Sequence, residues 1–281
     1  MIIWIASYPK SGNTYLRSFL ASYYYSEDGN FDFNQLLKIH QFPNIKLSKF
    51  TPNSKEEASK NWMFNQNTFF ERNKLNLVKT HNCLYPYREN NFTSKNETIG
   101  AIYIVRDPRN LITSLKHHYA IGYEKAIELM LDENSSLLEK SHDKDFSNFT
   151  YLNSWSNHYN SWKNSSDFKT LFIKYEDLEK NRTEIFKKII FFVNEITENN
   201  QKINEKKLSN SIKTTNFSNL KNKELNEGFE ESVYSKNTGK KISFFNLGFN
   251  NRWQKKLPVD IKNKANKIFE KNLNELDYPN E

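Results

Sequence analysis

Residues 2–17 of the chain read IIWIASYPKSGNTYLR, and this stretch decides the fold. Its opening apolar run predicts a buried strand over residues 2–7, because strand formers stand there without a break. Pro9 and Gly12 predict a tight turn after the strand. Apolar residues at helical spacing then predict a helix over residues 14–25. The chain therefore begins with a strand, a turn and a helix.

The turn in this unit has the chemistry of a phosphate-binding cradle. Backbone N–H groups of the first helical turn and the helix dipole attract an anion to one point. Lys10, Ser11 and Thr14 add side-chain donors beside that point. The loop of nucleotide triphosphatases has the pattern G-x-x-x-x-G-K-[ST], whereas Gly12-Asn13-Thr14 stand here in place of Gly-Lys-Thr. A strand–turn–helix unit that binds no ligand is the alternative interpretation.

The pattern Tyr-Pro-Lys-Ser-Gly-x-Thr after a first strand, at residues 8–14, resembles the sulfotransferases that use 3′-phosphoadenylyl sulfate (PAPS). The resemblance extends from residue 2 to about residue 257. It implies a single sulfotransferase domain over residues 1–281, with a three-layer α/β/α fold, a central parallel sheet and the P-loop-NTPase-like architecture of that family. It also implies transfer of a sulfuryl group from PAPS to a hydroxyl or amine, with adenosine 3′,5′-bisphosphate (PAP) as the product and no metal.

The rest of the chain alternates apolar strands with helices, which independently predicts a parallel sheet covered on both faces. Further strands are predicted at residues 75–79, 98–106 and 170–175. Helices are predicted at residues 108–119, 122–140, 150–163, 185–193 and 200–221, and from Pro258 to near Leu276. Residues 26–73 are predicted to form short helices and loops, and residues 222–248 a flexible stretch.

A second anion-binding position is predicted at the end of the strand 98–106. Arg106 ends this strand, and Ser114 lies eight residues on, two turns into the next helix. Ligands of an open parallel sheet bind beyond the carboxyl ends of its strands, so Arg106 and the cradle should face one crevice. The resemblance assigns Arg106 and Ser114 to the 3′-phosphate of the nucleotide. An ion pair between Arg106 and Asp107 is the structural alternative.

His81 is the candidate general base. It closes the triplet Lys79-Thr80-His81 after a predicted strand, on the same side of the sheet as the cradle. A neutral imidazole beside an acceptor hydroxyl suits proton abstraction near neutral pH. The resemblance implies that His81 is catalytic and that Lys10 stabilises the leaving 5′-phosphate. Cys83, two residues on, leaves a Cys–His nucleophile pair as an alternative.

The resemblance also assigns the rest of the nucleotide site. Adenine needs flat apolar faces and a few polar contacts. By this assignment the 5′-phosphate is held by Lys10, Ser11, Gly12, Asn13 and Thr14, and the adenine by Tyr15, Tyr175, Thr215 and Phe217. Gly248 belongs to the C-terminal segment that approaches the 3′-phosphate.

That C-terminal segment departs from the family pattern. The family commonly has Arg-Lys-Gly, four residues and then Trp, and the basic pair wraps the 3′-phosphate. Counting back from Trp253 places Asn246, Leu247 and Gly248 there, so the arginine and the lysine are missing. The candidates to replace them are Arg252, Lys240 and Lys241. The dimer motif of some members is not recognisable after Trp253, so neither that dimer nor another oligomeric state is predicted.

Composition limits the partners of the chain. Its 281 residues include 41 Lys and Arg against 33 Asp and Glu, a formal net charge of +8, which favours anionic partners. The basic residues are scattered, so a nucleotide is favoured over nucleic acid. One cysteine excludes an intrachain disulfide. The apolar runs are too short to cross a membrane and no signal peptide precedes the first strand, so we expect a cytoplasmic protein.

The acceptor of the sulfuryl group is expected to be a small molecule or a glycan. Residues 26–73, 120–150 and 222–247 are expected to line its pocket. Two other functions stay open. A P-loop-type nucleotide kinase would place its lysine beside Gly12, where Asn13 stands instead. A catalytically impaired nucleotide- or glycan-binding relative is compatible with the missing basic pair.

Overall fold

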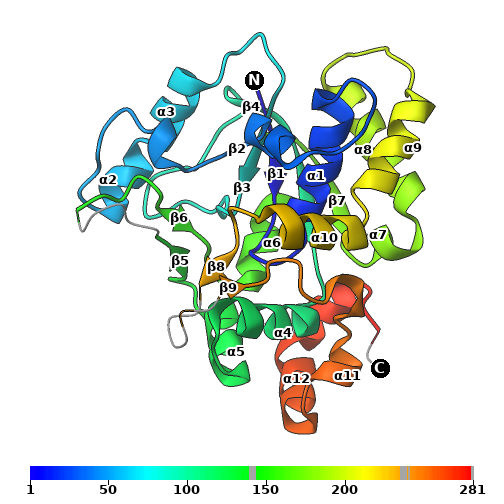
Figure 1. Ribbon diagram of the computed structural model, residues 1–281. Coiled ribbons are helices and arrows are strands. Elements are labelled where there is room, and N and C mark those ends of the chain that lie inside the picture. The colour runs from blue at the N-terminus through cyan, green and yellow to red at the C-terminus, as the bar shows by residue number, and fades with distance from the viewer. Residues whose placement is uncertain (139–143, 235–238, 240, 280–281) are drawn as a thin grey trace.

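A five-stranded parallel sheet forms the centre of the computed structural model, which describes residues 1–138, 144–234, 239 and 241–279 (Figure 1). The strand order is β2-β3-β1-β4-β7. The strands are β1 Ile2–Ala6, β2 His40–Gln41, β3 Asn76–Thr80, β4 Thr98–Val105 and β7 Lys169–Lys174. β1 is central and hydrogen-bonds to β3 on one side and to β4 on the other. The predicted parallel sheet is confirmed, and β2 adds an edge strand of two residues.

Helices cover both faces of the sheet, because successive side chains of each strand point to opposite sides. Ile102 and Ile104 of β4 pack on the first face, and Tyr103 and Val105 pack on the second. The first face is covered by α1 Asn13–Tyr25, α8 Arg182–Ile196, α9 Glu205–Thr214 and α10 Phe217–Glu227. The second is covered by α3 Trp62–Phe69, α4 Pro108–Tyr119, α5 Tyr123–Leu131, α6 Trp155–Lys163 and α12 Val259–Glu275. The predicted α/β/α architecture is confirmed.

The remaining elements are short and lie in the connections. The helical ones are η1 Phe33–Lys38, η2 Ile45–Leu47, α2 Lys55–Lys60, α7 Asp177–Lys180, η3 Gly248–Asn250 and α11 Trp253–Lys256. Two antiparallel pairs join β5 Ser136–Leu137 to β6 Thr150–Tyr151 and β8 Val233–Tyr234 to β9 Lys241–Ile242. Within the described ranges, no helix combines the length and the apolar character needed to cross a bilayer.

Two predicted helices are wrong at one end. The helix predicted over 122–140 ends as α5, because Asp132 leaves the helical conformation and its carbonyl accepts from the Ser135 N–H (3.1 Å). Residues 136–137 form strand β5 instead, and residues 139–140 lie outside the described residues. The helix predicted from residue 150 begins only at α6, because the Ser154 hydroxyl caps it by accepting from the Asn157 N–H (3.3 Å).

The stretch 222–248 has more regular structure than predicted. α10 continues to Glu227, so the prediction of a flexible segment is wrong at its start. The Glu224 carboxylate then accepts from the Ser232 hydroxyl (2.7 Å) and from the N–H groups of Phe244 (2.7 Å) and Phe245 (2.9 Å). These bonds connect α10 to Ser232 and to residues 244–245, which lie further along the same stretch. Residues 235–238 and 240 lie outside the described residues.

Candidate active site

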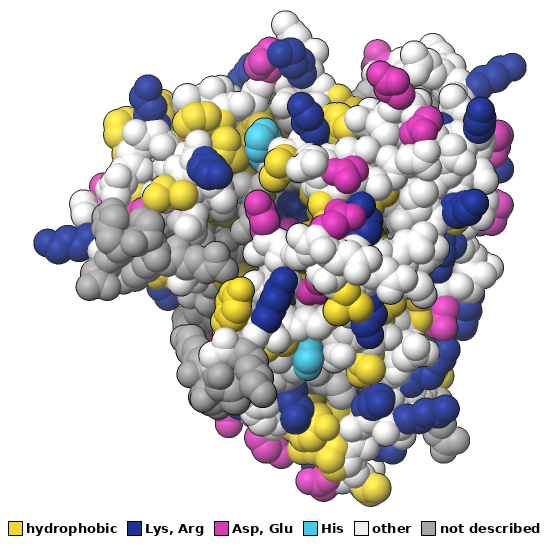
Figure 2. All heavy atoms as spheres, in the orientation of Figure 1, with side chains coloured by type: hydrophobic (Ala, Val, Ile, Leu, Met, Phe, Trp, Pro, Cys, Tyr) yellow, Lys and Arg dark blue, Asp and Glu magenta, His cyan; other side chains and the backbone are white. Residues whose placement is uncertain are grey.

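A cavity of about 1520 Å³ opens beyond the carboxyl ends of β1, β3 and β4. The turn after β1, the ends of β3 and β4, helix α4 and residues 227–232 and 244–248 form its walls. All three segments that were predicted to line the acceptor pocket contribute side chains to it. The space-filling view shows acidic and basic side chains close together around a hollow in the middle of this face (Figure 2).

The turn after β1 and the first turn of α1 form one wall. The residues of this wall are Lys10, Gly12, Asn13, Thr14 and Tyr15. Gly12 has a φ of +102°, and a Cβ atom there would lie 2.4 Å from the Tyr175 ring, so the turn requires glycine. The first N–H groups of a helix have no intrahelical partner and are therefore available to a ligand. Ser11 of the same turn is buried and does not line the cavity.

The ammonium group of Lys10 is held among side chains of the cavity wall. Its Nζ lies 3.4 Å from Nδ1 of His118 and 3.8 Å from the centre of the Phe244 ring. Burial lowers the pKa of Lys10 to about 7, and the nearby cations Lys79 and Arg106 act in the same direction. Burial and the Lys10 charge also lower the pKa of His118 to about 3. His118 is therefore neutral, and its Nδ1 accepts from Lys10.

Arg106 faces the same cavity as the Lys10 turn. Its two Nη atoms donate to the carbonyl oxygen of Lys10 (3.0 Å) and to that of Gly248 (3.3 Å). The guanidinium lies over the Tyr175 ring, 4.3 Å from the ring centre. Ser114 of α4 lines the cavity as well. The two anion-binding positions predicted from separate strands therefore lie on one cavity.

Asp107 pairs with Arg109 instead of Arg106. Arg109 donates from Nη2 to Oδ2 of Asp107 (2.8 Å) and from Nε to Oδ1 (3.0 Å). Both side chains are buried, with exposed fractions of 0% for Arg109 and 4% for Asp107. The alternative of an Arg106–Asp107 ion pair is wrong, because Arg109 takes both carboxylate oxygens.

Aromatic rings lie between the cradle and the C-terminal segment. Tyr175 stacks on Phe249, with ring centres 4.9 Å apart and an angle of 25° between the planes. Gly248 has a φ of +54°, and a Cβ atom there would lie 2.6 Å from the Phe217 ring. Phe217 and Tyr175 both line the cavity. Thr215 does not line it, because the residue is buried and its hydroxyl donates to the Ser211 carbonyl (2.6 Å).

His81 lines the cavity with one ring nitrogen already used. Its Nδ1 lies 2.7 Å from the Ser7 carbonyl oxygen, which can only accept, so Nδ1 carries the proton and Nε2 keeps a lone pair. Burial holds the pKa of His81 well below its usual value, and Lys79 adds to this effect. Nε2 of His158 in α6 lies 2.9 Å from the His81 carbonyl, and Nδ1 of His158 lies 2.8 Å from the Tyr103 hydroxyl. These bonds fix the backbone at the predicted general base.

Cys83 is not part of this cavity. Its thiol is buried, with Sγ 3.3 Å from the Ser161 hydroxyl, and burial raises its pKa to about 11. The alternative of a Cys–His nucleophile pair is wrong, because Cys83 does not share the cavity with His81. In the part of the chain that the structure describes, no group of three or more His, Cys, Asp or Glu side chains is placed to hold a metal ion.

Comparison with known families decides the identity of the fold. The family profile described as "Sulfotransferase domain" matches residues 2–277. The chain belongs to the sulfotransferase family. Its reaction class is therefore sulfuryl transfer. No curated protein sequence matches the chain.

Solved structures share the fold of this sulfotransferase at low sequence identity. Mouse sulfotransferase SULT7A1, crystallised with PAP, is 20% identical over 96% of this chain and 83% of that chain, with a TM-score of 0.58. Retinol dehydratase in complex with retinol and PAP is 18% identical over 97% of this chain and 81% of that chain, with a TM-score of 0.55. Retinol dehydratase in complex with androsterone and PAP is 18% identical over 97% and 80%, with a TM-score of 0.52.

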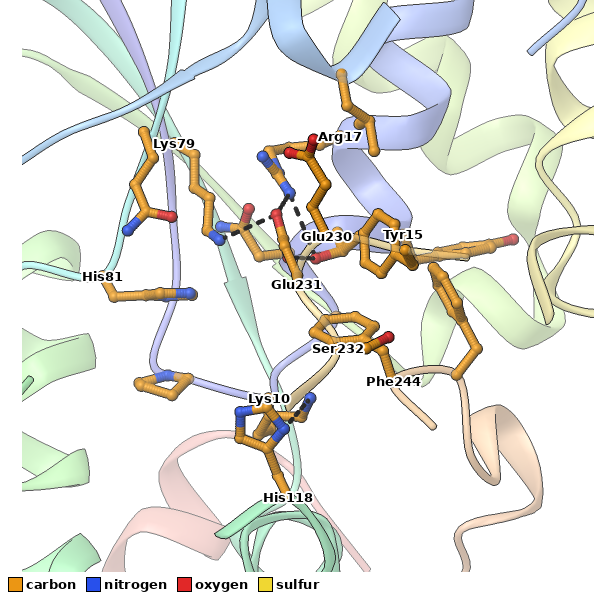
Figure 3. Close-up of a pocket in the computed structure, with 18 of the residues that line it drawn as sticks. Lys10, Tyr15, Arg17, Lys79, His81, His118, Glu230, Glu231, Ser232 and Phe244 are labelled. Carbon is orange, nitrogen blue, oxygen red and sulfur yellow. Dashed lines mark hydrogen bonds and ion pairs between the residues drawn. The ribbon is translucent and has the colours of Figure 1, made fainter. Parts of the chain in front are cut away.

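The sulfotransferase also places a carboxylate in its cavity, which the sequence did not predict. Oε2 of Glu231 accepts from the Thr14 hydroxyl (2.8 Å), and Oε1 pairs with Arg17 and with Lys79 Nζ (3.4 Å) (Figure 3). Burial alone would raise the pKa of Glu231, but Arg17, Lys79 and the Thr14 hydroxyl hold it well below its usual range. Thr14 and Arg17 stand three residues apart on α1 and share a helix face, which is the signal that could have revealed Arg17.

Of the three candidates to replace the missing Arg-Lys pair, the two that the structure describes do not line the cavity. Arg252 donates to the Glu179 carboxylate (2.8 Å) and is exposed, so its proposed approach to the phosphate is wrong. Lys241 is exposed and also absent from the cavity wall. Lys240 lies outside the described residues. Gly248 lines the cavity.

Proposed function

We propose that this sulfotransferase moves a sulfuryl group from PAPS to a hydroxyl or amine of a small acceptor, with His81 as general base and Lys10 neutralising the leaving 5′-phosphate. One observation carries the proposal. A single cavity brings together the Lys10 turn, Arg106, a set of rings and an imidazole whose Nε2 is unprotonated. A nucleotide with a phosphate at each end needs two cationic positions on either side of an adenosine slot.

The residues present fit such a nucleotide. The Arg106 Nε is a buried polar atom without a hydrogen-bond partner among the described residues, and Arg106 lines the cavity. Buried polar atoms are normally satisfied, so this one beside the proposed 3′-phosphate position supports an anionic ligand there. Gly12 and Gly248 supply close backbone approach, since a Cβ atom at either would strike a ring of the slot. The solved relatives are described as complexes with PAP, which agrees with this assignment.

PAPS, when bound, supplies the sulfuryl group and a 5′-phosphate as the leaving group. His81 receives the acceptor proton at Nε2, while its Nδ1–H stays on the Ser7 carbonyl and keeps the ring in place. Lys10 carries a positive charge to the leaving phosphate, and an adjacent phosphate raises the pKa of Lys10 above its value of about 7. Transfers of this kind pass through loose transition states, so positioning and charge neutralisation provide most of the rate.

A small acceptor is favoured over a large one by two observations. The cavity has a volume of about 1520 Å³, enough for a nucleotide and a further small molecule. The described complexes of retinol dehydratase hold retinol or androsterone beside PAP. We therefore propose a small-molecule alcohol, phenol or amine as the first class of acceptors to test.

The experiment combines nucleotide binding with turnover. Calorimetry should show that PAP binds more tightly than AMP or ATP–Mg²⁺, and an acceptor panel should accept sulfate from PAPS. His81→Asn should lower kcat about 10²–10⁴-fold while PAP affinity stays within about twofold. Lys10→Met should lower kcat about 10²–10³-fold, and Lys255→Met, at an exposed lysine outside the cavity, is the matched control.

Three results would overturn the proposal in different ways. Near-normal turnover of both His81→Asn and Lys10→Met removes the assigned roles. Preference for ATP–Mg²⁺ over PAP points to a nucleotide kinase. Binding of PAP without transfer to any acceptor of the panel points to a binding protein.

A further inference from the structure

A short strap crosses the cavity between α10 and β8. We define the strap as residues 228–232. It is anchored at both sides of Glu231, because Phe229 packs against the Phe245 ring (centres 5.4 Å apart) and the Ser232 hydroxyl donates to Glu224 (2.7 Å). Neither contact involves the phosphate cradle, so the position of Glu231 is fixed by residues outside the cradle.

The Glu231 carboxylate makes a hydrogen bond or an ion pair with each of three groups on the opposite wall. They are the Thr14 hydroxyl, the Arg17 guanidinium and the Lys79 ammonium group (Figure 3). The Arg17 and Lys79 side chains are only 4% and 7% exposed, whereas Glu231 is 27% exposed. The two cations therefore belong to the wall, and the carboxylate reaches them from the open side.

The same three groups surround the place proposed for the 5′ end of the donor. Thr14 lies in the first turn of α1, which is the proposed phosphate cradle, and Lys79 lies two residues before His81 on β3. The 5′ end of PAPS carries a phosphate and a sulfuryl group, both anionic. Two anions cannot share one buried set of donors without strong repulsion.

We infer that Glu231 is an internal competitor of the donor: its carboxylate and the 5′ anionic end of PAPS bind the same subsite, formed by Thr14, Arg17 and Lys79. The inference rests on the proposed function and names the group that regulates its nucleotide site. Donor binding displaces the Glu231 side chain from this subsite.

Competition reduces the apparent affinity for the donor by the fraction of molecules in which the subsite is accessible. Glu231→Gln keeps the size of the side chain but replaces charge-assisted bonds with neutral ones, which are weaker. We therefore expect Glu231→Gln to bind PAP about ten- to hundred-fold more tightly than the unmodified chain. Glu231→Asp keeps the charge but shortens the side chain, so it should also bind PAP more tightly.

Calorimetry with two nucleotides tests the inference. PAP carries a 5′-phosphate, whereas 3′-AMP lacks it and should not compete with Glu231. The gain in Glu231→Gln should therefore appear with PAP and be absent with 3′-AMP. Glu230→Gln is the matched control, because it removes one charge from the neighbouring exposed residue of the same strap. Thermal unfolding with and without PAP confirms that each variant is folded.

Each result decides between the inference and the proposed function. A selective gain for PAP in both Glu231 variants, including a case in which only the variants bind PAP, supports the inference. Unchanged or weaker PAP binding by folded Glu231 variants overturns the inference and leaves the proposed function intact. An equal gain with 3′-AMP or in Glu230→Gln shows a general charge effect and also overturns it. Absence of PAP binding in every variant removes the proposed function and the inference with it.

Discussion

PAP binding should weaken about fiftyfold between pH 7 and pH 9, because Lys10 must be protonated to pair with a phosphate. Burial lowers the pKa of Lys10 to about 7, and a bound phosphate raises it again. Binding above pH 7 therefore takes up a proton. The affinity for PAP falls as the pH rises above the pKa of Lys10 in the unliganded protein, about 7. Half of the Lys10 side chains are protonated at pH 7 and about one in a hundred at pH 9, which sets the magnitude.

The assay is calorimetric titration with PAP at half-unit steps of pH in buffers of different ionisation enthalpy, which also counts the proton taken up. The phosphates of PAP have their second pKa near 6 and keep their charge across this range. His81 and His118 are held neutral there, since the pKa of each lies well below 7. Lys10→Arg should remove the pH dependence, because arginine stays charged. A flat profile in the unmodified chain, or an equally steep one in Lys10→Arg, refutes the reasoning.

Two substitutions with one control substitution, and one alkylation experiment, test the packing around and beneath the site. Gly248→Ala should cost about 1–3 kcal/mol in urea unfolding, because its Cβ would lie 2.6 Å from the Phe217 ring at a positive φ. Gly122→Ala meets no atom within 4 Å and should change stability by less than about 0.5 kcal/mol. The Cys83 thiol should resist alkylation at pH 8 and react only after unfolding, since it is buried with a pKa of about 11. Arg109→Met should cost about 3–5 kcal/mol, because it leaves a buried carboxylate without its partner.

Each of these outcomes has a clear opposite. Equal stability of the two glycine variants would show that the ring contact is not limiting. Alkylation of the native chain at the rate of a free thiol would place Cys83 at the surface. Unfolding of Arg109→Met within about 0.5 kcal/mol of the unmodified chain would show that the buried ion pair contributes nothing net.

The strands and the turn between β1 and α1 were predictable because their signals are local. Continuous apolar runs identify buried parallel strands, and the turn residues at 9–12 lie directly between the first strand and its helix. Arg106 and the cradle could be placed on one crevice because the carboxyl ends of parallel strands meet at the same edge. The structure confirms that placement.

The missed features depend on contacts between distant parts of the chain. Thr14 and Glu231 are separated by 217 residues, and no local pattern marks their hydrogen bond. Lys10 and His118 meet only because α4 returns over the turn after β1.

The wrong helix end after Leu131 has a local cause. Asp132-Glu133-Asn134-Ser135 consists of residues that favour a turn, and this turn signal was overlooked because Leu137 and Leu138 follow it.

The central position of β1 has a consequence for how the chain is made. This strand is made before the other strands of its sheet, yet its two hydrogen-bonded neighbours, β3 and β4, end 74 and 99 residues after it does, at Thr80 and Val105 against Ala6. The apolar strand therefore lacks both neighbours until Thr80 is made, and it stays without β4 until Val105 is made. Segments in that condition are prone to association with other chains. Nascent chains truncated shortly before residue 76 should consequently bind chaperones more strongly than chains that extend beyond Val105.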